Sequence, residues 1–261
     1  MNAYTIAGIN TLSNKEKREI FLPLIPRGLF ERFSLPADLF DGDGNSLITF
    51  DKGPEGQDLE LKIFHQYGFR DPILYSHLTD TLLSQVHVLL YIMNDPTSPR
   101  FDVDFLPDGT PTNFGTSIRN VPAEEAAMAA GLLPGQIRRG FNLLSEAVVA
   151  FEDFVEGLKH TMYFLEPLYY HNAIIFERYG YKYQEGKRRM EEIHRRFSED
   201  TILIDKLDGT TFRKPEAQQS IFYRSWAIHD GILEEPYTDV TMYKVLGIKD
   251  KLNTAPDIPW I

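Results

Sequence analysis

The chain contains no cysteine among its 261 residues. This absence excludes disulfide bonds, thiolate nucleophiles, and zinc or iron–sulfur centres that depend on cysteine ligands. No apolar run approaches the roughly 18 residues needed to span a bilayer. The first residues, Met1 to Thr5, lack the basic and apolar regions of a secretory signal. We therefore expect no membrane partner and a cytoplasmic location.

Positive charge is also scarce, because 38 acidic residues face 27 basic ones and the net charge is −11. A negative average field repels nucleic acids and anionic membranes, so neither is an expected partner. Basic residues cluster at Arg138-Arg139 and between Lys187 and Arg196. The second cluster alternates with glutamates at helical spacing, which favours a solvated helix face with ion pairs over a binding patch.

The pattern of apolar residues predicts an α+β fold that forms a single domain over residues 1–261. The first half is expected to form an antiparallel or mixed sheet, packed with several helices from the second half. Strands are predicted at 47–50, 59–64, 86–93 and 101–105, and the first two form a hairpin. A capping box at Ser13 to Glu16 predicts a helix over 13–24, which Pro23 and Pro26 truncate, and Asp71-Pro72 predicts the start of a helix over 73–83. Further helices are predicted at 29–33, 123–130, 136–158, 168–179 and 186–197. Short elements are predicted at 201–204, 220–228 and 240–246.

A basic, glycine-containing turn at Gln136-Ile137-Arg138-Arg139-Gly140 precedes the predicted helix over 136–158. A helix N-terminus exposes unpaired N–H groups and the positive end of the helix dipole. Flanking arginines would make it a site for a phosphate or pyrophosphate. The alternative is that Pro134-Gly135 only turns the chain and that the arginines are solvated.

This turn, with the residues after it, resembles the core of the GNAT superfamily of N-acyltransferases. The resemblance rests on the run from Leu133 to Phe141, the helix that follows, the apolar segment His160 to Leu165, and the ending Phe176-Glu177-Arg178-Tyr179-Gly180-Tyr181. It covers residues 133–183, and the core it implies spans residues 86–183. In that family the turn holds the coenzyme A pyrophosphate and the next strand lines the acyl site.

The resemblance implies a small-molecule acyltransferase that binds an acyl-CoA or a similar phosphate-bearing ligand. The cofactor-binding residues that it implies are Gln136, Arg138, Arg139, Gly140 and Phe141. Three positions depart from the family pattern. Ile137 stands three residues before Gly140, Asn142 ends the turn, and Phe176 stands where the family often has a tyrosine that acts as a general acid. We therefore consider the neighbouring hydroxyls of Tyr169, Tyr170 and Tyr179 as substitutes and take Tyr170 and Tyr179 as catalytic candidates.

Histidine and glutamate recur at helical spacing and suggest a second hypothesis. The residues concerned are Glu152, Glu156, His160, Glu166, His171, Glu191, Glu192 and His194. Carboxylates and imidazoles on facing helices build di-iron and di-manganese sites, so a metal-dependent enzyme is an alternative. A matched pair of Glu-x-x-His helices is absent, which favours solvated side chains, and we assign no metal ligand.

The segment Arg224 to Gly231 gathers an arginine, a tryptophan, a histidine and an aspartate. We expect the Trp226 ring to be buried and Arg224 and His229 to face a cleft, with His229 as a catalytic base. The alternative is a core tryptophan followed by a turn at Asp230-Gly231. Adjacent residues of a strand point to opposite faces, which argues against a simple triad with Ser225.

A third hypothesis is a noncatalytic binding or oligomerisation protein, in which the aromatic residues, 13% of the chain, fill a core and an interface. A homo-oligomer is compatible with this composition.

Overall fold

The computed structural model describes residues 4–53, 55–112 and 118–261. Its internal contacts divide the chain into two compact units, called unit 1 and unit 2 below. Unit 1 comprises Met1–Thr97, Gly140–Glu166 and Tyr243–Ile248, and unit 2 comprises Ser98–Arg139, Pro167–Met242 and Lys249–Ile261. Each unit is built from three separate segments. The expected single domain stays a prediction.

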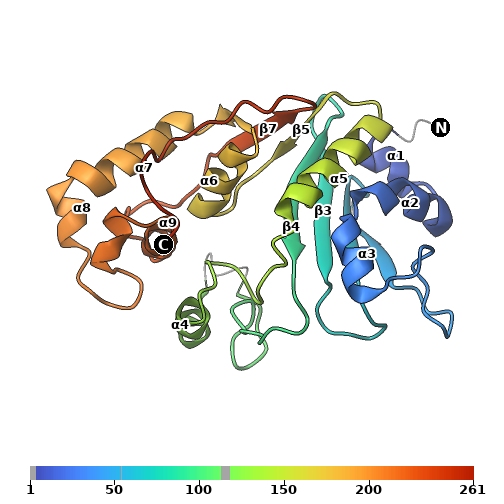
Figure 1. Cartoon of the computed structure of the whole chain (residues 1–261), viewed down its shortest axis with the longest axis horizontal. Coiled ribbons are helices and arrows are strands. Elements are labelled where there is room, and N and C mark those ends of the chain that lie inside the picture. Colours follow the sequence, from blue (N-terminus) through green and yellow to red (C-terminus); the bar gives the residue numbers. More distant parts are fainter. Residues whose placement is uncertain (1–3, 54, 113–117) are drawn as a thin grey trace. The chain divides into compact units, whose positions relative to one another are not determined.

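The described strands form a mixed sheet, which confirms the α+β class. The strands are β1 (Ile48–Lys52), β2 (Asp58–Ile63), β3 (Leu74–Asp80), β4 (Val86–Met93), β5 (Met162–Leu165), β6 (Lys182–Glu185) and β7 (Thr241–Val245). Their order is β1-β2-β3-β4-β5-β7-β6. Figure 1 labels β3, β4, β5 and β7 of this sheet. Strands β1 to β4 are antiparallel to one another, as expected for the first half of the chain, whereas β4 and β5 are parallel.

The helices of unit 1 are α1 (Ile6–Asn10), α2 (Asn14–Phe21), the 3-10 helix η1 (Leu22–Leu24), α3 (Arg27–Phe33) and α5 (Leu144–Gly157). Helix α2 begins with the predicted capping box, because Ser13 accepts a hydrogen bond from the N–H of Glu16 and Glu16 bonds back to Ser13. The chain leaves α2 at Pro23 and Pro26, as predicted, because proline does not continue a helix.

Aromatic side chains connect α5 to the sheet of unit 1. Phe151 packs edge-on against Tyr91 of β4, with ring centroids 5.0 Å apart, and stacks on Tyr163 of β5 at 5.6 Å. One turn further along, Phe154 stacks on Phe21 of α2 at 5.1 Å. Offset aromatic pairs of this kind stabilise a core by about 0.5–1.5 kcal/mol beyond their buried area. Helix α5 is therefore fixed across the parallel pair β4 and β5.

Unit 2 is mostly helical. Its helices are α4 (Val121–Ala129), α6 (Tyr170–Arg178), α7 (Lys187–Glu199), α8 (Thr201–Asp205), the 3-10 helix η3 (Pro215–Gln218) and α9 (Ile221–His229). The basic cluster lies on α7, where Lys187 pairs with Glu191 and Arg195 pairs with Glu192 and Glu199. These pairs follow the helical spacing that the sequence predicts for a solvated face.

Three sequence predictions of secondary structure are wrong. Residues 73–83 were expected to form a helix after Asp71-Pro72, but they contain strand β3, in which Leu74, Ser76 and Leu78 alternate toward the core. Residues 101–105 were expected to form a strand, but they form turns that end in an isolated bridge between Phe105 and Pro111. The segment 220–228, considered as a strand, belongs to helix α9.

Within the described ranges, no helix is long and apolar enough to cross a membrane.

Candidate functional site

The parallel strands β4 and β5 pair over a short distance, and β5 then ends. Their register consists of His87 with Phe164 and Val88 with Leu165, and the N–H of Glu166 donates to the carbonyl of Val88. Strand β5 ends at this point, whereas β4 continues for five residues, from Leu89 to Met93. Among the described residues, no strand pairs with this part of β4 on the β5 side.

The open part of β4 carries apolar side chains that are not fully buried. Leu89, Leu90, Tyr91, Ile92 and Met93 are all half-buried, whichever face of the sheet they point to. The paired strand β2, in contrast, alternates between buried and half-buried residues along its whole length. The edge of β4 thus combines a stretch of backbone that no described strand pairs on the β5 side with a half-exposed apolar lining. An extended ligand with amide groups has the chemistry to bind such an edge.

The chain returns to the end of β4 four residues before helix α5 begins. Gly140 lies against this end, since a Cβ atom built on it would be 3.5 Å from the carbonyl oxygen of Met93. Helix α5 begins at Leu144, and its N-cap residue Leu143 provides no side-chain hydrogen bond. The first-turn N–H groups and the positive end of the helix dipole therefore lie near the open edge.

One carboxylate lies in the first turn of α5. Glu146 accepts a hydrogen bond from the backbone N–H of Gly28, with 2.9 Å between nitrogen and oxygen. Its negative charge weakens the attraction of this helix end for an anion. Ser145, immediately before it, is exposed.

The predicted anion-binding turn does not open a helix. We expected the helix to start at Gln136, but α5 starts at Leu144, and Asn142 has a left-handed φ of 59° that no helix continues through. The boundary between the units falls after Arg139, so Gln136, Arg138 and Arg139 belong to unit 2 and Gly140 and Phe141 to unit 1. The prediction that this turn forms the start of the helix is therefore wrong.

The side chains of this turn bind neighbouring backbone groups. Gln136 accepts from the N–H of Leu133 at 2.8 Å, which closes the turn that begins at Leu133. Arg138 donates to the carbonyl of Ser98, and Arg139 donates to the carbonyl of Ala130 at 3.0 Å. These bonds fix the turn within unit 2. Binding of a phosphate by the two arginines stays a prediction.

Phe141 is buried in unit 1. Its ring packs edge-on against Phe33 with centroids 5.5 Å apart, and the guanidinium of Arg32 lies 4.8 Å from its centroid. Phe141 therefore anchors the segment between Gly140 and α5 on helix α3.

The two candidate tyrosines lie at opposite ends of α6 in unit 2. Tyr170 begins the helix and is buried, and its hydroxyl accepts from Nη1 of Arg224 at 3.3 Å. Burial raises the pKa of Tyr170 and outweighs the opposite effect of Arg224. Tyr179 is the C-cap residue of α6 and precedes Gly180, which has a left-handed φ of 82°. Glu177, two residues before Tyr179, is buried and accepts a hydrogen bond from the hydroxyl of Thr254. This residue of the motif from Phe176 to Tyr181 therefore has a structural role.

His229, the third candidate, forms a buried pair with Glu124. It is the last residue of α9, and its Nε2 lies 3.0 Å from Oε1 of Glu124 on α4. The two side chains are 8% and 3% exposed. Burial raises the pKa of Glu124, but hydrogen bonds from His229 and Arg119 lower it by more, so the pKa lies below the ordinary glutamate value. The carboxylate is thus ionised at neutral pH.

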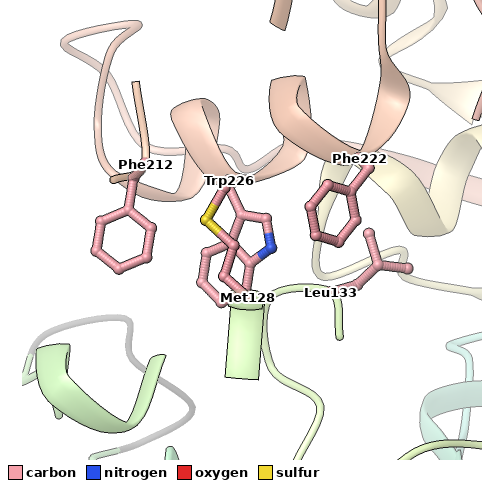
Figure 2. Packing of buried hydrophobic residues seen from close by; sticks show 5 residues of the cluster. All are labelled: Met128, Leu133, Phe212, Phe222 and Trp226. Atoms are coloured by element: carbon pink, nitrogen blue, oxygen red, sulfur yellow. The ribbon is translucent and has the colours of Figure 1, made fainter. Parts of the chain in front are cut away.

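An apolar cluster next to this pair holds α4 and α9 together. Figure 2 shows Trp226 and Phe222 of α9 beside Met128 of α4, with Phe212 and Leu133 on either side. Trp226 is fully buried, as predicted, and its indole N–H donates to the carbonyl of Leu132 at 3.0 Å. His229 follows Trp226 by three residues, which places both side chains on one face of the helix.

Arg224 was expected to face a cleft, but it is fully buried and has several partners. Its guanidinium donates to the carbonyl oxygens of Ala217 and Gln218, approaches Nδ1 of His194 at 3.3 Å, and lies 4.8 Å from the ring centroid of Phe197. Four of the five N–H groups of this buried guanidinium thus have partners, so the side chain links neighbouring elements of unit 2.

Three of the candidate metal ligands bind other groups. Glu152 pairs with Lys244, His160 bonds to the carbonyl of Tyr4, and His194 contacts Arg224. Among the described residues there is no group of three histidine, aspartate or glutamate side chains arranged to hold a metal ion.

Glu124 and Tyr169 are the site residues that sequence reasoning missed as partners of His229. Tyr169 lies between two imidazoles: its ring stacks on His171 with centroids 5.6 Å apart and meets His229 edge-on at 5.7 Å. Gly135 makes room for it, because a Cβ atom there would lie 2.5 Å from the Tyr169 hydroxyl. The only local signal was the helical spacing of Trp226 and His229, since Glu124 is 105 residues away.

Comparisons of the chain with protein-family models, with curated proteins and with solved structures gave no match.

Proposed function

We propose that the chain is a small-molecule acyltransferase that binds an acyl-CoA in unit 1. The observation that carries the proposal is the end of β5 at Leu165, which leaves β4 from Leu89 to Met93 without a described partner strand on that side, together with the N-terminus of α5 that no side chain caps. The sequence resemblance to N-acyltransferases over residues 133–183 supports the same ligand. The open edge and the helix end come from one unit and from adjoining segments of it.

The chemistry of an acyl-CoA suits both parts of this arrangement. Its pantetheine arm is an extended chain with two amide groups, which can exchange hydrogen bonds with the open edge of β4 as an added strand does. Its methylene groups can cover the half-buried side chains from Leu89 to Met93. Its pyrophosphate is an anion that the first-turn N–H groups of α5 would attract.

Calorimetric titration with a series of ligands tests the proposal. Coenzyme A and acetyl-CoA should bind, and 3′,5′-ADP should bind more weakly because it lacks the arm that lies along β4. Each ligand should raise the melting temperature in the order of its affinity, since binding to the folded state alone stabilises it. An acetyl-CoA titration without heat and without a change in melting temperature at millimolar concentration would remove the proposal.

Two substitutions on α5 test where the phosphates bind. Ser145→Glu places a second carboxylate in the exposed first turn and should weaken acetyl-CoA binding about tenfold, within the range of helix-end charge effects. Val149→Glu is the matched control, because Val149 is 58% exposed and lies one turn further along the same helix. It adds the same charge away from the helix end and should leave the affinity nearly unchanged.

Removal of a carboxylate from the first turn of α5 should have the opposite effect on acetyl-CoA affinity. Glu146→Gln removes the first-turn carboxylate but keeps an oxygen that can accept the hydrogen bond from Gly28. Acetyl-CoA should then bind a few-fold more tightly. Equal affinities of the wild type, Ser145→Glu and Glu146→Gln would show that the phosphates bind elsewhere.

A further inference from the structure

A histidine and a glutamate of unit 1 meet where strand β5 ends. His87 of β4 pairs in register with Phe164 of β5, and Glu166 follows directly after β5. Nε2 of His87 lies 3.4 Å from Oε1 of Glu166. The imidazole is 17% exposed and the carboxylate 45% exposed, so the pair reaches solvent on the glutamate side. The two residues border the open part of β4, which begins at Leu89.

The Nε2 atom of His87 lacks a hydrogen bond. It is buried and has no hydrogen-bond partner among the described residues, although Glu166 lies close. Burial lowers the pKa of His87 below the ordinary histidine value, and the opposite effect of Glu166 is smaller. The ring is therefore mainly neutral at pH 7, and a neutral imidazole can accept a hydrogen bond at Nε2. A buried polar atom of this kind calls for a ligand that supplies the missing bond.

Aromatic side chains adjoin this pair on the same face of the sheet. Tyr163 stacks on Phe151 of α5, so the next residue, Phe164, points to the opposite face of the sheet. His87 shares that face, because side chains in register on paired strands point the same way. The ring of Tyr243 on β7 lies 6.1 Å from that of Phe164. Both rings are half-buried and thus present an accessible aromatic surface.

The acceptors and the charge of this arrangement select one kind of ligand. Nε2 of a neutral imidazole and a carboxylate can both accept hydrogen bonds, so a ligand that binds both of them must supply two donors. The carboxylate favours a donor that carries a positive charge. A primary ammonium group has three N–H donors and one positive charge, which meets both conditions. The aromatic rings can hold an aromatic body attached to this group.

We propose that unit 1 has a binding site for an arylalkylamine in its cationic form, called the amine site below and formed by His87, Phe164, Glu166 and Tyr243. Glu166 and Nε2 of His87 accept hydrogen bonds from the ammonium group, and the two rings pack against the aromatic body. All four residues belong to unit 1. The role of this amine as the acyl acceptor rests on the proposed function, whereas its binding needs no acyl-CoA.

The chemical step in that role balances without any further reactant. The amine nitrogen forms a bond to the thioester carbonyl carbon, and the carbon–sulfur bond breaks. The ammonium group loses two protons. One of them goes to the departing thiolate, and the other goes to the solvent.

Calorimetric titration of the full chain with phenethylamine at neutral pH tests the amine site without acyl-CoA. Phenethylamine should bind, and two analogues should bind about tenfold more weakly, because each lacks one part of the ligand. Phenethyl alcohol keeps the ring and lacks the charge, whereas ethylamine keeps the charge and lacks the ring. No binding of phenethylamine at millimolar concentration, or equal binding of either analogue, would overturn the inference.

Glu166→Gln tests which group holds the ammonium ion. It keeps the size of an exposed side chain and removes the negative charge, so phenethylamine should bind about tenfold more weakly with the melting temperature nearly unchanged. Glu156→Gln is the matched control, because Glu156 is exposed on α5, which packs on the other face of the sheet. It removes the same charge and should leave the affinity unchanged. Equal losses in the two variants would reveal a nonspecific charge effect and overturn the inference.

His87→Phe tests the part of the imidazole. Phenylalanine keeps a ring in the sheet and removes the Nε2 atom, so phenethylamine should bind several-fold more weakly without a loss of stability. An NMR map of the wild type covers the case in which a variant does not fold. Phenethylamine should shift the backbone amides at 87, 164–166 and 243. Shifts that leave all of these amides unperturbed would overturn the inference.

The outcomes separate the amine site from the proposed function. Phenethylamine binding that depends on Glu166, without acetyl-CoA binding, supports the amine site and removes the proposed function. Acetyl-CoA binding without phenethylamine binding does the reverse. If both ligands bind, kcat/KM for thiol release from acetyl-CoA should be about tenfold higher with phenethylamine than with ethylamine, and Glu166→Gln should raise KM for the amine more than it lowers kcat. Equal values for the two amines would overturn the inference.

Discussion

The buried imidazole of His171 links the stability of unit 2 to pH. Its pKa is about 3 in the folded protein against an ordinary value of 6.5, because burial opposes the charged form and the nearby His229 adds to this. The unfolded chain therefore takes up a proton first as the pH falls. The stability linked to this group is complete above about pH 6.5 and is lost progressively below it.

Replacement of His171 by phenylalanine should remove this pH dependence. Phenylalanine keeps a ring that can stack on Tyr169, and it has no proton to gain. Between about pH 7.5 and pH 5, the free energy of unfolding of the wild type should fall relative to that of His171→Phe by on the order of 2 kcal/mol. Urea unfolding of both proteins at a series of pH values measures this difference. A difference that does not change with pH would show that His171 is not buried in its neutral form.

Single residues also show where sequence reasoning stops. Trp226 was expected to be buried because of its type and its apolar neighbours, and burial follows from such local information. The partner of His229 could not be found in this way, because Glu124 lies in another helix and reaches His229 only when α4 and α9 pack. Arg224 was assigned to a cleft, but it is buried and four hydrogen-bond partners from elsewhere in unit 2 bind its guanidinium.

At the scale of elements, the predictions succeeded where the signal was local. The capping box at Ser13 and the alternation of Leu59, Leu61 and Ile63 with polar residues define α2 and β2 without help from the rest of the chain. The prediction failed at 73–83, because proline at a first helical position seemed stronger evidence than the alternation that places Leu74, Ser76 and Leu78 in the core. Tertiary packing against β2 and β4 decides this segment.

The start of α5 was misplaced for a similar reason. The pattern from Gln136 onward contains apolar residues at helical spacing, but Phe141 is drawn to Phe33 and Arg32, outside the helix. The left-handed Asn142 then turns the chain into α5. Asparagine tolerates this conformation better than most residues, and the sequence offered no other sign of it.

Substitutions at Asn142 distinguish the observed turn from a continuous helix. In a left-handed position, Asn142→Ala should destabilise the protein by about 1 kcal/mol, whereas Asn142→Gly should be neutral or slightly stabilising. In a helix interior the order reverses, because alanine is the best helix former and glycine costs about 1 kcal/mol. The melting temperatures of the two variants decide the matter. A higher value for Asn142→Ala than for Asn142→Gly would contradict the turn.

At the scale of the whole molecule, the chain alternates between two compact units. The chain passes from unit 1 to unit 2 after Thr97 and returns to unit 1 at Gly140. It passes to unit 2 again at Pro167, after β5. The points where the chain passes between the units lie next to strand and helix ends and not in a polar stretch. The sequence therefore shows no linker between the units. The division into two units also separates Arg138 and Arg139 from the helix end with which they were grouped.

The division gives each unit its own chemistry in the present account. Unit 1 provides an open strand edge with a helix N-terminus, and unit 2 provides the pair of Glu124 and His229 with Tyr169 and His171. The α+β class and the mixed sheet were predictable from hydrophobic periodicity. The short pairing of β4 with β5 was not, because it joins strands separated by more than 60 residues.

Binding of an acyl-CoA by unit 1 is tested most directly by the map of backbone amide shifts that acetyl-CoA causes in the NMR spectrum of the full chain. We expect changes concentrated at 89–93, along the open edge of β4, and at 143–146, in the first turn of α5. Weaker changes should follow in the adjoining segment at Gly140. Binding with these amides unperturbed, or with changes confined to unit 2, would contradict the account.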